Sequence, residues 1–296
     1  MVDSENISQL GLQEYVLQLE VDGLCVVPPD VHGVPLSDFD LMVDVLLAKA
    51  QSMVGCPFSL DRGPHAELTF NNGQPQAGIA EDRTRLSQFL IQQLAQLHRV
   101  FRDLAVNPVA VALMQHLIGS KATRFSSHNS FVKWQGEFGY GPSLGLHADQ
   151  TAVPLPWGRT ALTANTNWCL TDYTLDGGAL AYVPGSHRFA SRPQLPAASI
   201  QAVPVEAPRG SVIVFHGATW HGAFPRKDPG MRISVANYYR HVMITSQEDI
   251  QNGFPRELAE DCRDPQQFKR LAGFFDEFPY RQQSQPVPTV VGSATG

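Results

Sequence analysis

The segment Ser211-Val-Ile-Val-Phe-His-Gly-Ala-Thr-Trp-His221 carries the clearest strand signal in this chain. Its apolar first half predicts a β-strand, which runs into a polar end that carries His221. The turn residues Lys227-Asp-Pro-Gly230 follow, and Arg232-Ile-Ser-Val-Ala-Asn-Tyr-Tyr239 predicts a second strand. We expect a hairpin that brings Arg232 and Ser234, two residues apart on one face, towards His221.

Similar short strands occupy the second half of the chain. From about Lys121, runs of β-branched and aromatic residues alternate with Gly, Pro, Asn and Asp. Further examples are Ser130–Trp134, Thr163–Leu170 and Ala179–Val183. This spacing favours a jelly roll over the strand–helix alternation of a parallel sheet. The sequence therefore predicts an α+β fold with a double-stranded β-helix core, cupin-like, and flanking helices that are mostly N-terminal.

Helical patterns dominate the first 120 residues. We expect helices over residues 13–19, 37–53 with Ser37 as N-cap, 83–103 and 108–118, and a brief strand over 24–27. Helices return over 246–278. We expect one domain over residues 1–296, with helical support (1–120), a jelly-roll core (121–242), a C-terminal helical segment and candidate lid (243–280) and a flexible tail (281–296).

Composition excludes several classes of protein. With 43% apolar and 17% charged residues among 296, the chain can bury a sizeable core. Its formal charge of -6 argues against a nucleic-acid partner. No apolar run reaches the roughly 18–20 residues that span a bilayer, and the polar N-terminal residues do not resemble a secretory signal. Four cysteines without a CxxC pair favour a reducing compartment. We therefore expect a cytoplasmic protein, with a homodimer as the commonest assembly.

The triplet His147-Ala-Asp149 is a candidate metal site. On a strand, side chains two residues apart point to one side, so both could bind one ion. An imidazole and a carboxylate begin the 2-His-1-carboxylate arrangement that suits Fe(II). The pattern alone is weak, because His65-Ala-Glu67 has the same form, and we interpret that triplet as an exposed loop pair.

Arg232 is a candidate anion ligand. An arginine inside a β core is costly unless it meets an anion, and a guanidinium with a nearby serine hydroxyl suits a dicarboxylic acid. The alternative is that Arg232 is a surface residue of its strand.

Residues from about 121 to 242 resemble the phytanoyl-CoA dioxygenase family of iron(II)- and 2-oxoglutarate-dependent oxygenases. The matching pieces are His147-Ala-Asp149, Trp168-Cys-Leu-Thr-Asp172, Gly178-Ala-Leu-Ala-Tyr-Val-Pro-Gly-Ser-His187-Arg, Gly210 to His221, and Arg232 with Ser234. The chain departs from many relatives at Gly177, which replaces an asparagine, and at Leu180, where some have a cosubstrate-binding threonine.

The resemblance implies a role for each matching residue. His147, Asp149 and His221 would bind Fe(II), and Arg232, helped by Ser234, would hold the 5-carboxylate of 2-oxoglutarate. Two further residues lie on strands where relatives place polar cosubstrate contacts, Lys133 and Asn165. The reaction would use O2 and release succinate and CO2.

Asp149 implies hydroxylation, or the related desaturation or epoxidation, because halogenating members of the wider class lack this carboxylate. We expect the substrate to be a small organic molecule, a natural product or other apolar metabolite, since no basic cluster suits the phosphates of an acyl-CoA. Four aromatic residues are candidates for the pocket wall: Phe131, Tyr140, Trp157 and Trp220.

Two alternatives remain open. One is a catalytically silent jelly roll that binds a ligand, which would have no chemical reason to keep His147, Asp149, His221 and Arg232 together. The other is a cupin-type metalloenzyme that does not use 2-oxoglutarate, for which the usual His-x-His is absent.

Overall fold

The computed structural model describes residues 4–68, 87–136, 143–278 and 286. The helices of these residues are α1 (Ser4–Gln9), α2 (Gln13–Asp22), α3 (Pro29–His32), α4 (Leu36–Val54), α5 (Leu94–Leu97), α6 (Arg99–Ala105), α7 (Pro108–Ile118), α8 (Ile250–Gly253) and α9 (Pro265–Leu271). The strands are β1 (Leu24–Val27), β2 (Phe58–Ser59), β3 (Gly63–Pro64), β4 (Gln88–Ile91), β5 (Thr123–Gly136), β6 (Thr163–Cys169), β7 (Leu180–Tyr182), β8 (Val203–Val205), β9 (Val212–His216), β10 (His221–Ala223) and β11 (Arg226–His241). None of the described helices is both long and apolar enough to cross a bilayer.

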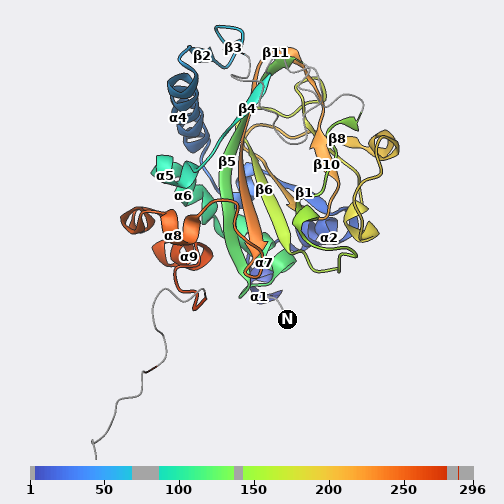
Figure 1. The fold of residues 1–296 in the computed structure, drawn as a ribbon, viewed down its shortest axis with the longest axis vertical. Coiled ribbons are helices and arrows are strands. Elements are labelled where there is room, and N and C mark those ends of the chain that lie inside the picture. Colours follow the sequence, from blue (N-terminus) through green and yellow to red (C-terminus); the bar gives the residue numbers. More distant parts are fainter. Residues whose placement is uncertain (1–3, 69–86, 137–142, 279–285, 287–296) are drawn as a thin grey trace, which may run out of the picture.

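Two antiparallel sheets form the β core. The larger has the strand order β1-β9-β6-β11-β5-β4 and the smaller has the order β10-β7-β8, while β2 and β3 pair separately. From β6 to β11 the chain passes from the larger sheet to the smaller and back twice, which is the winding of a jelly roll. Figure 1 shows the long strands β5, β6 and β11 in the middle, α4 to α6 and α8 to α9 on one side, and β8 and β10 on the other. The predicted fold class is confirmed.

Alternation along β11 divides the larger sheet into two faces. Ile233 and Val235 are fully buried in the apolar cluster that the sheet shares with α4, α6 and α7. The intervening Arg232, Ser234 and Ala236 point to the opposite face, because successive side chains of a strand alternate. The sequence pattern thus places its polar members on the side that faces the smaller sheet.

Helix α7 supports the larger sheet from behind. The Asn107 side chain accepts hydrogen bonds from the backbone N–H groups of Val109 and Ala110, both at 3.1 Å, and Pro108 occupies the first turn. Almost every residue of α7 is buried, and the helix contacts β5, β6, β9 and β11. The helix expected over 108–118 is therefore confirmed.

The expected N-cap of α4 is wrong. The helix begins at Leu36 after Pro35, and no side chain caps its first turn, so Ser37 lies inside the helix. Pro35 occupies the N-cap position in an extended conformation, and its ring fixes φ there. The helix therefore begins without a serine cap.

The helix expected over 83–103 is confirmed only from Leu94 onward, as α5 and α6, and is wrong before that residue. Residues 83–86 lie outside the described residues, and Gln88–Ile91 form the edge strand β4, in which Gln88 pairs with Lys133 of β5. Gln93 then has a φ of 59°, which interrupts a continuous helix before α5 and α6. The apolar spacing fitted a helical stripe, but pairing with β5 satisfies the backbone of this segment.

The expected hairpin between the segments of His221 and Arg232 is not formed. His221 belongs to β10 of the smaller sheet, whereas Arg232 belongs to β11 of the larger one. The two residues instead lie on facing sheets and line one pocket. The helices expected over 246–278 are confirmed as α8 and α9.

Candidate metal and cosubstrate site

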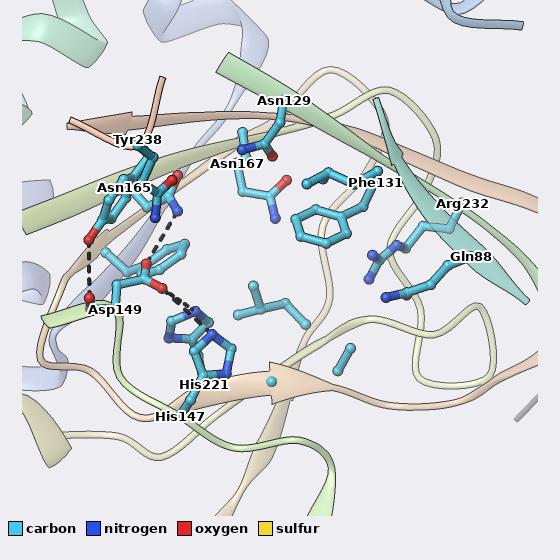
Figure 2. Close-up of a pocket in the computed structure, with 17 residues that line it drawn as sticks. Gln88, Asn129, Phe131, His147, Asp149, Asn165, Asn167, His221, Arg232 and Tyr238 are labelled. Carbon is cyan, nitrogen blue, oxygen red and sulfur yellow. Dashed lines mark hydrogen bonds and ion pairs between the residues drawn. The ribbon is translucent and has the colours of Figure 1, made fainter. Parts of the chain in front are cut away.

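Three side chains converge at one end of the pocket between the sheets. His147, Asp149 and His221 each offer one ligand atom, and these atoms all lie within 4.8 Å of one another. The Nε2 atoms of both histidines are 3.6 Å from Asp149 Oδ1. Figure 2 shows the two imidazoles side by side beneath the carboxylate. The described residues contain one group of three or more His, Cys, Asp or Glu side chains that could hold a metal ion, and it is this one.

Backbone pairing places the two histidines next to each other. The His147 N–H donates to His221 O and the His221 N–H donates to His147 O, both at 2.9 Å. Ala148 is extended, and Asp149 then begins a 3₁₀ turn that ends at Ala152. The triplet is therefore not part of a regular strand, but one extended residue suffices to bring His147 and Asp149 to the same side.

Hydrogen bonds fix the tautomer of each imidazole. His147 Nδ1 donates to Gly145 O and His221 Nδ1 donates to Thr219 O, both at 2.9 Å. Because a carbonyl oxygen can only accept, Nδ1 carries the hydrogen, and Nε2 turns a lone pair towards Asp149. This arrangement orients both rings for a metal ion.

Two contacts orient Asp149. Asn165 Nδ2 donates to Asp149 Oδ2 at 3.3 Å, and the Tyr238 hydroxyl donates to the backbone oxygen of Asp149 at 3.1 Å. The second carboxylate oxygen, Oδ1, is the one that faces the histidines. The site therefore presents one carboxylate oxygen and two imidazole nitrogens, a donor set that fits Fe(II).

Burial and the contacts among the three side chains shift their pKa values in different directions. Burial lowers the pKa of His221 to about 4, which keeps its ring neutral. Burial opposes ionisation of Asp149, but His221 and His147 outweigh it and hold the pKa of the carboxyl below its usual value. Burial likewise opposes charging of His147, and its contact with Asp149 nevertheless raises the pKa of that imidazole.

Arg232 occupies the other end of the pocket, as Figure 2 shows. Arg232 is 5% exposed, and its Nη1 donates to Gly178 O at 2.6 Å, while its Nε has no hydrogen-bond partner in the segments that the structure describes. No carboxylate of the described residues forms an ion pair with it. Tyr173 lies against the guanidinium, 4.9 Å from Cζ to the ring centroid. A buried arginine in this state calls for an anion.

A second buried basic side chain lies beside Arg232. Lys133 is directly opposite Arg232 in the pairing of β5 with β11, and its Nζ donates to Phe224 O at 2.7 Å. Burial, followed by the charges of Arg232 and Arg226, pushes the pKa of Lys133 well below its usual value. An anion bound at Arg232 would relieve this repulsion.

The pocket encloses about 270 Å³ and brings together His147, Asp149, His221, Arg232 and Asn165. Lys133 and Ser234 are fully buried on the same sheet face, next to the lining residues. The sequence reasoning missed several residues of the wall: Gln88, Leu90, Asn129, Asn167, Tyr238 and Gln247. Strand alternation from Phe131 and Ser234 could have found Asn129 and Tyr238, whereas the helix expected over 83–103 concealed Gln88.

Other candidates lie elsewhere. Phe131 lines the pocket, whereas Trp157 and Trp220 pack in a separate apolar cluster, and Tyr140 lies outside the described residues. His65 of the rival triplet is exposed, with Nε2 3.2 Å from the Ser59 hydroxyl.

Comparison with known proteins identifies the family to which the chain belongs. The model of the phytanoyl-CoA dioxygenase (PhyH) family matches residues 74–234. Since this match covers more than half of the chain, the chain belongs to that family, as the sequence motifs predicted.

Two fungal proteins are among its relatives. Dioxygenase af480 of Aspergillus fumigatus is 32% identical over 171 residues, which are 56% of this chain and 53% of that protein. Dioxygenase aneA of Aspergillus aculeatus is 27% identical over 197 residues, 64% of each protein. The matches thus span between about half and two thirds of these relatives.

Solved structures share the fold. The 2-oxoglutarate-dependent carbocyclase SnoK from nogalamycin biosynthesis is 20% identical, with a TM-score of 0.55 over 77% of this chain and 83% of that one. HygX from Streptomyces hygroscopicus, solved with nickel and 2-oxoglutarate, is 14% identical, with a TM-score of 0.55 over 79% of this chain and 88% of that one.

Proposed function

We propose that this protein is an Fe(II)- and 2-oxoglutarate-dependent dioxygenase that hydroxylates a small organic molecule. One observation carries the proposal: a single pocket holds a group of two histidines and one aspartate at one end and a buried arginine, with no acidic partner among the described residues, at the other. The bound iron would supply the oxidising chemistry, using O2 and converting 2-oxoglutarate to succinate and CO2.

Each residue has a defined task in this proposal. His147, Asp149 and His221 would hold the iron through Nε2, Oδ1 and Nε2. Arg232 binds the 5-carboxylate of 2-oxoglutarate, and the Ser234 hydroxyl assists it. Lys133 adds positive charge beside Arg232. Asn165 orients Asp149 and offers its amide to the cosubstrate.

The relatives support the proposal at the level of chemistry. Both fungal relatives are named dioxygenases, and HygX has been solved with nickel, 2-oxoglutarate and hygromycin B bound. A pocket of about 270 Å³ is suited to a small molecule.

The test is anaerobic binding to the purified full-length protein. Fe(II) followed by 2-oxoglutarate should give a weak visible charge-transfer band, and calorimetry should show saturable binding of 2-oxoglutarate. Arg232→Ala should weaken that binding at least tenfold, because the buried ion pair is lost. The control is Lys227→Ala on the same strand, whose exposed ammonium pairs with Asp176 at the surface.

A folded, iron-loaded protein that neither shows the band nor binds 2-oxoglutarate would instead support the silent jelly roll. If Arg232→Ala bound 2-oxoglutarate as tightly as the unsubstituted protein, Arg232 would have no part in the site.

A further inference from the structure

A serine joins two carboxamide side chains on the wall of the pocket. Asn129 and Gln247 both line the pocket, although they are far apart in the sequence. Asn129 Nδ2 donates to Ser127 Oγ at 3.3 Å, and the Ser127 hydroxyl donates to Gln247 Oε1 at 2.6 Å. Asn129 belongs to the larger sheet, across the pocket from His221 of the smaller sheet (Figure 2).

This chain of hydrogen bonds gives the two amides opposite roles. A hydroxyl donates one hydrogen, so a serine between two amides accepts from one of them and donates to the other. One amide therefore keeps its oxygen unused and the other keeps its NH2 unused. This holds for either direction of donation through the serine. Here these groups are Asn129 Oδ1 and Gln247 Nε2. Asn129 Oδ1 is buried and has no partner among the described residues, and native structures seldom leave such an oxygen unpaired.

Gln247 is held in place by its backbone. The Gln247 N–H donates to Ser126 Oγ at 3.1 Å, and the Glu248 N–H donates to Ser126 O at 2.8 Å. The Glu248 carboxylate in turn accepts from the N–H groups of Gln93 at 2.9 Å and His128 at 3.2 Å. Residues 246–248 are therefore attached to β5, and the Gln247 amide is presented in a fixed direction.

The part of the pocket near these amides is electrically neutral. The described lining residues that carry a charge or can bind a metal are His147, Asp149, His221 and Arg232, and the proposed iron and 2-oxoglutarate use all four. Neither a carboxylate nor an ammonium remains to pair with a charged substrate, and burying an unpaired charge is costly. The part of the substrate that enters here is expected to be neutral.

We propose that Asn129 and Gln247 recognise a neutral substrate group in which a hydrogen-bond donor adjoins an acceptor, as in a lactam or carboxamide. The inference rests on the proposed function only in that the recognised group would belong to the molecule oxidised at the iron. It refines the expectation of an apolar metabolite, because the buried Asn129 oxygen calls for a hydrogen-bond donor on the substrate.

Three bicyclic probes of nearly equal shape test the proposal: 3,4-dihydroquinolin-2(1H)-one, 2-tetralone and tetralin. The first carries N–H beside C=O, the second replaces N–H by CH2, and the third has neither group. Dissociation constants are measured by ligand-observed NMR on the full-length protein under anaerobic conditions with Fe(II) and 2-oxoglutarate. The lactam should bind about tenfold more tightly than 2-tetralone, because loss of the donor leaves a buried oxygen unpaired.

Asn129→Leu should remove the preference for the lactam over 2-tetralone, and Gln247→Met should remove the preference for 2-tetralone over tetralin. Gln247 is exposed, so its variant remains informative if Asn129→Leu does not fold. Gln96→Met, which replaces an exposed glutamine of α5 outside this pocket, should keep both preferences. Equal affinities for lactam and ketone, a preference that survives in the variant that should remove it, or absence of lactam binding would each overturn the inference. Calorimetry with 2-oxoglutarate on the same samples reports separately on the proposed function.

Discussion

The phenol ring of Tyr173 lies against the guanidinium of Arg232, with Cζ 4.9 Å from the ring centroid. Tyr173 is 1% exposed and lies outside both sheets, where its backbone pairs with Ala207. Its hydroxyl donates to Asn167 Oδ1 at 3.3 Å, and burial raises the pKa of Tyr173 to about 12, so this donor persists at neutral pH. One side chain thus supports two residues of the pocket, Arg232 through its ring and Asn167 through its hydroxyl.

Separate substitutions of Tyr173 should distinguish the two contacts. Tyr173→Leu removes the ring and should weaken binding of 2-oxoglutarate about tenfold, since a desolvated cation–π contact contributes up to about 2 kcal/mol. Tyr173→Phe keeps the ring and should change that affinity less than threefold. Isothermal titration with 2-oxoglutarate under anaerobic conditions measures both.

Tyr239→Leu is the matched control for the loss of a buried tyrosine. Tyr239 is fully buried on the other face of the sheet, where its hydroxyl donates to Ala105 O. This variant should lower thermal stability without changing the affinity for 2-oxoglutarate. If Tyr173→Leu behaved in the same way, the contact with Arg232 would have no role in binding.

The bond between Asn165 and Asp149 should matter for metal affinity. Asn165→Leu removes the donor to Asp149 Oδ2 while keeping a side chain of similar size, so the carboxylate is free to rotate away from the histidines. We expect about a tenfold to hundredfold loss of Fe(II) affinity, the usual effect of removing a group that orients a ligand. Anaerobic competition with a chromophoric chelator measures the loss. Asn252→Leu, which removes an exposed amide that contacts Asp249, should bind Fe(II) normally.

How far the sequence predicts this site depends on how local each signal is. Alternation in β11 and the ordered motifs located His147, Asp149, His221 and Arg232, because each lies in a short pattern of its own. Gln88 was missed because its segment has apolar spacing that fits a helix, and only pairing with β5 makes it a strand. Gln247 has no local signal at all, since its position depends on hydrogen bonds to Ser126 and Ser127, about 120 residues earlier.

Local sequence patterns did not predict the topology of the two sheets either. A turn between two strands predicts a hairpin, yet β10 and β11 separate into different sheets. The separation places His221 and Arg232 across a pocket instead of side by side on one surface.

The cost of protonating the buried His128 ring should lower the stability of the folded protein in mild acid. Its ring is buried against Phe125, and neither ring nitrogen has a hydrogen-bond partner in the described part of the chain. Burial lowers the pKa of His128 from 6.5 to about 3. The unfolded chain therefore binds a proton between these values that the folded chain does not, so stability falls as the pH drops below 6.5. The contribution lost between pH 7 and pH 5 is about 2 kcal/mol.

Urea unfolding of His128→Leu at pH 7 and pH 5 measures this contribution. The stability difference between the two pH values should shrink by about 2 kcal/mol relative to the unsubstituted protein. His65→Leu, a substitution of an exposed histidine, should leave the difference unchanged. An unaltered pH dependence in His128→Leu would show that this ring is protonated without cost in the folded protein.

Glu248 attaches the segment that carries Gln247 to β5, and its removal should loosen that segment alone. Burial raises the pKa of Glu248, and its two oxygens accept from the N–H groups of Gln93 and His128. Glu248→Ala leaves both donors unpaired, so hydrogen exchange measured by mass spectrometry should accelerate at least tenfold over residues 246–248 and at His128. The neighbouring Asp249→Ala removes the N-terminal cap of α8 and should accelerate exchange only in that helix. Since Arg232 lies at the other end of the pocket, Glu248→Ala should bind 2-oxoglutarate normally while losing the preference for 2-tetralone over tetralin, which depends on Gln247. A parallel loss of 2-oxoglutarate binding would mean that the two ends of the pocket are not independent.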